Sequence, residues 1–458
     1  MKAAVPIAPV LGLALLASAI GLVEAGEAKQ PPNIVLFLAD DLGYADLACT
    51  GHPYAKTPVL DRLASEGAKF TQHYATGTTC CPSRTGIMTG RHPASYAKYP
   101  AEHGYSGRTT ITDLLKAHGY ATGHFGKWHM GRETTPGTYG IEEIIVKGKS
   151  QDAPGRDDDL VSDAIQFIEE HAKEPFYVNI WGHSTHYPVR NYPELAKQLG
   201  DIPFNRADFT DNIQGKFDES KAIHADLKES MRQYLADVYS IDKNMGRVLE
   251  ALDRLGIAGN TIVVFSSDQG PAPVKLASKD GREFSEHMLG YAGKLRGGKH
   301  EQLEGGVRVP FIIRWPGHVK AGRVDDQSVT SFMDWLPTLC AIAGIKQLPE
   351  GLDGEDVSDI WLGKPRERRT TLFWRASSPK GRTSLRQGHW KFHESDTGPL
   401  LYDLSRDEGE KRNVAAQFPQ VVKELSATAD AWRSTLPKEY DKGKKKPKDQ
   451  KRRRQTGR

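Results

Sequence analysis

The chain has 458 residues, of which 38% are hydrophobic and 26% are charged, as in ordinary soluble globular proteins. This length is too great for the core of one ordinary domain, so we expect two domains. The formal net charge of +4 comes from the end of the chain, where residues 442–458 hold ten Lys or Arg and one Asp and carry +9. The rest of the chain then carries −5, which gives no reason to expect a specific nucleic-acid binder.

The first 25 residues differ from the rest. Lys2 precedes a mainly apolar, uncharged run from Val5 to Val23, and small residues at Ala19 and Ala25 offer sites for a signal peptidase. We predict a signal peptide over 1–25 and a secreted or periplasmic protein. The run is long enough that a membrane anchor is the alternative. After cleavage, no segment is apolar enough for a stable membrane span.

Short apolar runs alternate with amphipathic stretches from residue 33 to about 315, which is typical of a mainly parallel sheet flanked by helices. The expected strands are 34–38, 120–125, 176–181 and 261–265, and the expected helices are 112–117, 159–171 and 235–255. In the last helix, apolar residues recur at spacings of three and four from Leu235 to Leu255, and Gly256 ends it.

The character of the chain changes past residue 350. Expected strands at 371–374, 383–386, 390–393 and 400–404, followed by a helix at 419–432, predict a small antiparallel sheet with one helix. We therefore expect a large α/β domain over 26–350 and a smaller subdomain over 351–438. Residues 439–458 are expected to form a basic, disordered tail, either solubilising only or weakly attracted to polyanions.

Polar side chains follow each of the four strands expected in the large domain. They are Asp40 and Asp41 after the first strand, Lys127 and His129 after the second, His183 and His186 after the third, and Asp268 and Gln269 after the fourth. Ligands bind at the carboxyl ends of strands in open α/β sheets, so four such ends indicate one shared site. Any single pair would more often be a capped turn or a surface loop.

The stretch from Cys80 to Arg91 carries the most information. Pro82 fits the first turn of a helix, which places Cys80 at the helix N-terminus, where free amide groups favour an anion. From these residues alone, Cys80 and Cys81 are either a reactive thiolate site or a structural cysteine pair. With Cys49 and Cys340 there are four cysteines, whose possible pairings the sequence does not separate.

The run Cys80-Cys81-Pro82-Ser83-Arg84, followed by Thr89-Gly90-Arg91, resembles the signature of the type I sulfatases. In that family a maturation enzyme oxidises the first cysteine to formylglycine (3-oxoalanine), so the resemblance implies this modification at Cys80, with Cys81 at the variable position. Further similar blocks are Pro32 to Tyr44, Gly126 to Gly131, Thr185 to Pro188, Ser267 to Pro271, Lys299 with Glu304 to Pro310, and Leu400 to Leu404. The chain is similar in style to arylsulfatase A and the N-acetylgalactosamine-6-sulfatases.

The resemblance implies an alkaline-phosphatase-like fold and a metal site. Its metal residues are Asp40, Asp41, Cys80, Asp268 and Gln269. The side chains of the unmodified residues offer only oxygen, which suits calcium better than zinc. Gln269 departs from the family, which usually has Asn or His there, but keeps an amide oxygen that can ligate a hard cation.

Catalytic roles also follow from the resemblance. The hydrated formylglycine attacks sulfur with one hydroxyl and expels sulfate with the other, while Arg84 orients the diol. His129 is expected to act as a base near the diol, and His186 as an acid toward the leaving oxygen. Lys127 and Lys299 add positive charge around the ester, and with His186 they bind the substrate. A further serine of the family cannot be placed, because the stretch from Ile141 to Asp159 does not match the family clearly.

We thus predict a sulfuric ester hydrolase acting on sulfated carbohydrates or aryl sulfates. One alternative is phosphodiester or phosphonate monoester hydrolysis by the same centre. Another is a sulfated-glycan binding protein without turnover, if Cys80 stays unmodified. The sequence leaves open the sugar, the sulfated position and the oligomeric state. Four other residues, expected more often to be structural than pocket-lining, are His183, Arg190, His287 and His300.

Overall fold

The structure, a computed structural model, describes residues 1, 30–146, 155–223, 225–274, 285–375 and 381–441. The chain divides into two compact units, Met1–Gln30 and Pro31–Arg458, and the fold lies in the second. The predicted signal peptide, apart from Met1, and residues 442–458 of the predicted tail lie outside the described residues. None of the described helices is both long and apolar enough to cross a membrane.

A nine-stranded mixed sheet forms the centre of the second unit, in the order β4-β3-β5-β1-β6-β7-β2-β8, with β9 beside β2. Its strands are β1 (Asn33–Ala39), β2 (Ala68–Tyr74), β3 (Ala121–Gly126), β4 (Glu143–Ile145), β5 (Phe176–Trp181), β6 (Thr261–Ser267), β7 (Arg308–Arg314), β8 (Arg323–Asp325) and β9 (Thr330–Ser331). The four strands predicted in this region, now β1, β3, β5 and β6, are parallel neighbours. β7 runs antiparallel to both of its neighbours.

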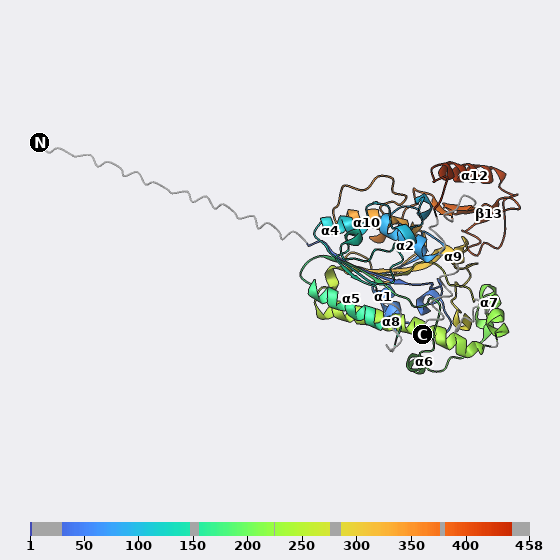
Figure 1. The fold of residues 1–458 in the computed structure, drawn as a ribbon, viewed down its shortest axis with the longest axis horizontal. Helices are drawn as coiled ribbons and strands as arrows, with labels where there is room; N and C mark the ends of the chain where they lie inside the picture. Colours follow the sequence, from blue (N-terminus) through green and yellow to red (C-terminus); the bar gives the residue numbers. More distant parts are fainter. Residues whose placement is uncertain (2–29, 147–154, 224, 275–284, 376–380, 442–458) are drawn as a thin grey trace, which may run out of the picture. The chain divides into compact units, whose positions relative to one another are not determined.

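Helices cover both faces of this sheet (Figure 1). On one face lie α1 (Pro58–Glu66), α5 (Asp158–Glu170) and α8 (Leu227–Arg254), and on the other lie α2 (Cys80–Thr89), α4 (Ile111–Ala117) and α10 (Trp335–Ile342). Further helices are α3 (Pro100–His103), α6 (Pro193–Leu199), α7 (Asp211–Ala222), α9 (Glu304–Val307) and α11 (Ser358–Trp361). The helices predicted at 112–117, 159–171 and 235–255 are confirmed as α4, α5 and α8. Their ends agree with the prediction to within one residue, except that α8 begins earlier, at Leu227.

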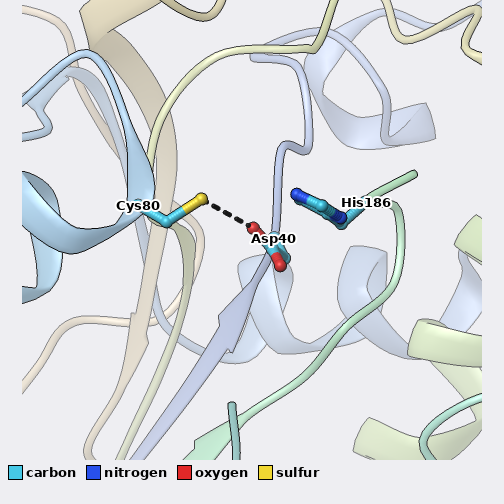
Figure 2. Close-up of side chains that lie close together, drawn as sticks. All are labelled: Asp40, Cys80 and His186. Carbon is cyan, nitrogen blue, oxygen red and sulfur yellow. Dashed lines mark hydrogen bonds between the residues drawn. The ribbon is translucent and has the colours of Figure 1, made fainter. Parts of the chain in front are cut away.

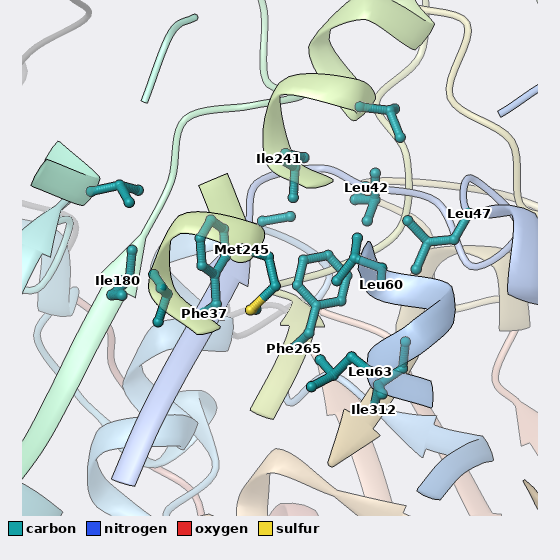
Figure 3. Close-up of a cluster of buried hydrophobic side chains, with 14 of the residues drawn as sticks. Phe37, Leu42, Leu47, Leu60, Leu63, Ile180, Ile241, Met245, Phe265 and Ile312 are labelled. Atoms are coloured by element: carbon teal, nitrogen blue, oxygen red, sulfur yellow. The ribbon is translucent and has the colours of Figure 1, made fainter. Parts of the chain in front are cut away.

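Two apolar cores follow from the alternation of side chains along the strands. In β1, Val35 and Phe37 face the core beneath α1, α5 and α8, whereas Leu36 and Leu38 face the core beneath α2, α4 and α10. Figure 3 shows the first core, where Phe37 and Phe265 of the sheet pack near Met245 of α8. Because both faces are buried, β1 reads in the sequence as a continuous apolar run.

The C-terminal region forms a separate four-stranded antiparallel sheet, β10-β11-β12-β13, as predicted. Its strands are β10 (Leu372–Arg375), β11 (Thr383–Gln387), β12 (Trp390–His393) and β13 (Leu400–Asp403), and α12 (Pro419–Ser434) packs on it. The alkaline-phosphatase-like class, a large mainly parallel sheet plus a smaller antiparallel one, is confirmed. The exact boundaries of the two predicted domains remain a prediction.

A buried ionic cluster joins this small sheet to the large one. Glu304 of α9 is fully buried and accepts hydrogen bonds from Lys391 Nζ of β12 at 2.8 Å and from the Tyr74 hydroxyl of β2 at 2.6 Å. Arg386 of β11 donates to the same hydroxyl. Burial alone would raise the pKa of Glu304, but Lys391, Arg386 and Arg308 lower it to about 2.

Candidate active site

The predicted shared site exists because the carboxyl ends of four adjacent strands meet. The backbone amide of Asp268 donates to Ala39 O at 3.2 Å, which keeps the ends of β1 and β6 in register. The amide of Lys127 donates to Trp181 O at 2.8 Å and does the same for β3 and β5. Gly126 makes this approach possible, because its φ is +107° and an added Cβ would lie 2.2 Å from Trp181 O.

Three carboxylates and one thiol converge at these strand ends. One ligand atom from each of Asp40, Asp41, Cys80 and Asp268 lies within 4.8 Å of the others, and all four residues are buried. The sulfur of Cys80 lies 3.4 Å from Asp40 Oδ1, and Figure 2 shows this contact with His186 on the far side of the carboxylate. Burial and the charge of Asp40 raise the pKa of both Asp41 and Asp268, so this centre would gain from a bound cation.

Cys80 occupies the position predicted for it, at the first residue of α2. Burial and the negative charges of Asp40 and Asp268 raise the pKa of its thiol, which does not favour a thiolate in the unmodified residue. All four cysteines are free, and therefore Cys80 and Cys81 do not form a structural disulfide. The sulfur atom marks where an aldehyde derived from Cys80 would project.

Arg84, one turn along α2 from Cys80, is buried beneath the centre. Its Nε and Nη2 donate to Asp268 Oδ2 at 3.1 and 2.8 Å, and Nη1 donates to Lys127 O at 3.3 Å. The guanidinium also lies 4.8 Å from the centre of the Trp181 ring. Arg84 thus fixes Asp268 directly; among the described residues its side chain forms hydrogen bonds with Asp268 and Lys127 but not with Cys80, so its role in orienting the diol remains a prediction.

Two lysines and one histidine approach the carboxylates from the open side. Lys127 Nζ bonds to Asp40, and Lys299 Nζ donates to Asp41 Oδ2 at 2.7 Å. His186 Nε2 lies 3.7 Å from the same Asp41 oxygen. Its Nδ1 lies 2.7 Å from Tyr187 O; because a carbonyl only accepts, Nδ1 carries a proton and Nε2 faces the centre. Lys127 and His186, which the strand-end pattern predicted to share one site, therefore lie beside the same pair of carboxylates.

Gln269 provides the test of whether a cation fits. Its Nε2 donates to Asp41 Oδ1 and, at 3.4 Å, to Cys80 Sγ, whereas its Oε1 is buried without a hydrogen-bond partner among the described residues. A rotation of the amide by half a turn would present Oε1 to the carboxylates, an arrangement that a cation between them would stabilise. The donor set fits a hard, oxygen-loving cation.

His129, the predicted base, is not held in this cluster. Its side chain is exposed and its backbone φ is +54°. Within the described parts of the chain, no hydrogen bond or ion pair joins its ring to Cys80. Its role as base therefore stays a prediction. His300, expected to be structural, ties the Lys299 loop to the loop before Cys80 through its backbone amide, 2.8 Å from Thr78 O.

The turn that carries His186 is held by residues that the sequence did not single out. Asp157 accepts hydrogen bonds from the backbone of His183 and Ser184, and Arg156 donates to the carbonyl of His186. His183 itself bonds to Asp157 through Nδ1 at 3.2 Å, which confirms the structural role expected for it. The only available signal was the run of acidic residues at the start of the helix at 159–171.

The fold and the convergent strand ends define a hydrolase of the alkaline-phosphatase-like class. The profile of the Sulfatase family matches residues 32–345, and a second profile, N-sulphoglucosamine sulphohydrolase, C-terminal, matches residues 299–434. The chain belongs to the sulfatase family and is a sulfuric ester hydrolase.

Known proteins agree with this assignment. Human arylsulfatase A is 31% identical over 500 residues, covering 90% of this chain and 89% of that protein. An N-acetylgalactosamine-6-O-sulfatase of Bacteroides thetaiotaomicron is 31% identical over 502 residues, covering 91% and 96%. The crystal structure of Ps i-CgsB in complex with k-i-k-neocarrahexaose has the same fold, with a TM-score of 0.76 at 23% identity and coverage of 94% and 98%. The predicted resemblance is thereby confirmed.

Proposed function

We propose that this chain is a secreted, calcium-dependent sulfatase that hydrolyses sulfate esters of carbohydrates after a maturation enzyme has oxidised Cys80 to formylglycine. The observation that carries the proposal is the convergence of the Cys80 sulfur with three buried carboxylates at the N-terminus of α2. The predicted signal peptide motivates the secretion. The name of the Bacteroides relative, an N-acetylgalactosamine-6-O-sulfatase, motivates sulfated amino sugars as the first substrates to test.

The residues of the cluster suit the two groups that the family uses. Asp40, Asp41, Asp268 and Gln269 would hold calcium, which supplies positive charge to the sulfate oxygens. Formylglycine at Cys80 would supply, as a hydrated aldehyde, an oxygen nucleophile that a thiol lacks.

The chain's own side chains then prepare the substrate. Lys127 and Lys299 lie beside Asp40 and Asp41 and so place two positive charges where a sulfate anion would enter. Their charge favours binding of the ester and stabilises negative charge that develops on the leaving oxygen. His186 presents Nε2 to the same space, with Nδ1–H anchored on Tyr187 O. Burial lowers the pKa of this ring to about 4, so Nε2 would hand a proton to the leaving oxygen only after the negative charge of the bound ester has raised that pKa and the ring has taken up a second proton.

The test begins with the maturation state of Cys80. Protein produced with the maturation enzyme should show, in a peptide mass spectrum, an aldehyde at Cys80 and an unchanged Cys81. It should release sulfate from defined sulfated saccharides, and the Cys80→Ala variant should release none. An aldehyde at Cys81, or an active Cys80→Ala variant, would contradict the proposal.

Matched substrates separate the alternatives. Aryl sulfate and aryl phosphate esters with the same leaving group should show a clear preference for sulfate. A preference for phosphate or phosphonate esters would instead indicate phosphorus chemistry at this centre. Binding of sulfated glycans without any turnover by protein with a confirmed aldehyde at Cys80 would indicate a binding protein.

A further inference from the structure

The turn that carries His186 is held by a buried carboxylate at the start of α5. Asp157 Oδ1 accepts from the backbone amide of His183 at 2.9 Å, and Oδ2 accepts from the amide of Ser184 at 3.0 Å. The His183 ring adds a third bond, with Nδ1 3.2 Å from Oδ1. Burial alone would raise the pKa of Asp157, but the bond and charge of His183 and the charge of Arg156 lower it, so Asp157 is an anion at neutral pH.

The other end of the turn is held by the preceding residue, Arg156, which is also buried. Its Nη1 donates to the backbone carbonyl of His186, and its Nη2 lies 3.5 Å from Tyr187 O. That second carbonyl is the same acceptor that binds His186 Nδ1 at 2.7 Å. Arg156 therefore fixes both the backbone of His186 and the atom that sets the direction of its ring.

A third buried group closes this arrangement from α8. Asp237 lies 3.7 Å from Arg156 Nη1 and accepts from the hydroxyl of Ser184 at 3.0 Å. Arg156 and Asp157 are together called the α5 bracket below. A buried ionic cluster is weak support for stability, because apolar residues of similar volume often stabilise a fold equally well. The concentration of these bonds on one short turn calls for another explanation.

We propose that the α5 bracket positions His186 in the catalytic centre. The bracket does not touch the reacting atoms; it acts through the turn, by fixing Nε2 toward Asp41 and the entering ester. This inference rests on the proposed function only in the role assigned to His186. Displacement of a reacting group by about 1 Å can cost about 100-fold in rate, so a small shift of this turn should be measurable.

Two variants weaken the hydrogen bonds of the bracket and keep side chains of similar size. In Asp157→Asn the amide group turns at least one N–H toward donors of the turn, and in Arg156→Lys one ammonium group replaces the fork that reaches two carbonyls. The matched control is Asp159→Asn. Asp159 is exposed in the first helical turn of α5 and is not one of the residues that bind the turn carrying His186. Thermal unfolding of each variant shows how much folded protein is assayed.

The assay compares kcat and KM for a sulfated sugar, whose alcohol leaves poorly, and for an activated aryl sulfate. Asp157→Asn and Arg156→Lys should lower kcat for the sugar by about 10- to 100-fold, with a smaller loss for the aryl sulfate, as expected for His186→Ala. In a His186→Ala background, Asp157→Asn should add little further loss. Asp159→Asn should match the unsubstituted enzyme.

Equal losses on both substrates that follow the loss of folded protein would overturn the proposal, as would full additivity of Asp157→Asn with His186→Ala. A second readout works even if His186 has no acid role. In spectra of ¹⁵N-histidine-labelled protein, the His186 ring signals, identified by their absence in His186→Ala, should shift in Asp157→Asn but not in Asp159→Asn. Unshifted signals in Asp157→Asn would refute positioning, whereas equal losses on both substrates in His186→Ala would refute only the acid role.

Discussion

Calcium should stabilise this protein by an amount that depends on its concentration relative to Kd. Three buried carboxylates lie at one point, yet only Asp40 and Asp41 have a lysine partner, and Asp268 is bound by Arg84. A cation that binds the folded cluster and not the unfolded chain stabilises by about 2.7 kcal/mol when its concentration is 100 times Kd. The entropy of unfolding for roughly 400 residues is about 0.8 kcal/mol/K, so Tm should rise by about 3 °C.

Scanning calorimetry with added calcium, and again after chelation, measures this rise directly. Asp41→Asn keeps the size of the side chain but removes a ligand charge, so its Tm should respond little to calcium. Asp242→Asn is a matched control, because Asp242 is a buried carboxylate of α8 that accepts from the amide of Leu60, outside the cluster. No calcium-dependent rise in the unsubstituted protein, an equal rise in Asp41→Asn, or a rise with zinc alone would refute the reasoning.

Two further outcomes follow from the site and from the ionic cluster around Glu304. Gln269→Asn should keep the calcium-dependent rise in Tm because it keeps an amide oxygen, whereas Gln269→Leu should lose it; equal responses in calorimetry would remove Gln269 from the ligand set. The pKa of Glu304, about 2 when folded, lies below its unfolded value near 4.5, so its stabilisation is present above pH 4.5 and is lost as pH falls toward 2. Lys391→Met leaves that carboxylate with Arg308, 3.7 Å away, as its remaining ion-pair partner, and should cost at most about 3–5 kcal/mol in urea unfolding at pH 7; an undiminished stability would show that Lys391 is not its essential partner.

The site at the carboxyl end of the sheet could be predicted because each strand and the polar residues after it are adjacent in the sequence. β1, β3, β5 and β6 are short apolar runs, and each is followed directly by charged or imidazole side chains, such as Asp40 after β1 and Lys127 after β3. Parallel neighbours present these ends on one edge, so no knowledge of strand order was needed to expect one site. Lys299 and Cys80 follow none of these strands, and only the family resemblance brought them in.

What could not be predicted depends on contacts between distant residues. β2 was missed because its polar residues Lys69, Thr71 and Gln72 interrupt the apolar pattern. The α5 bracket was missed because Asp157 binds a turn 26 residues away, and the sequence of neither segment indicates that the two are in contact. His129 is the opposite case: its motif is plain in the sequence, but among the described residues its ring makes no hydrogen bond or ion pair within the cluster, so its role as base stays a prediction.

The pairing of Glu304 with Lys391 also bears on how the chain can be made. Glu304 lies five residues after Lys299, and its charge is compensated by a strand that leaves the ribosome 87 residues later. Until that strand docks, the buried carboxylate has only Arg308, 3.7 Å away, as an ion-pair partner, so we expect the loop that delivers Lys299 to settle only after the large domain has been synthesised. A truncated protein that ends near residue 350 would therefore contain every proposed catalytic side chain and still fail to assemble them.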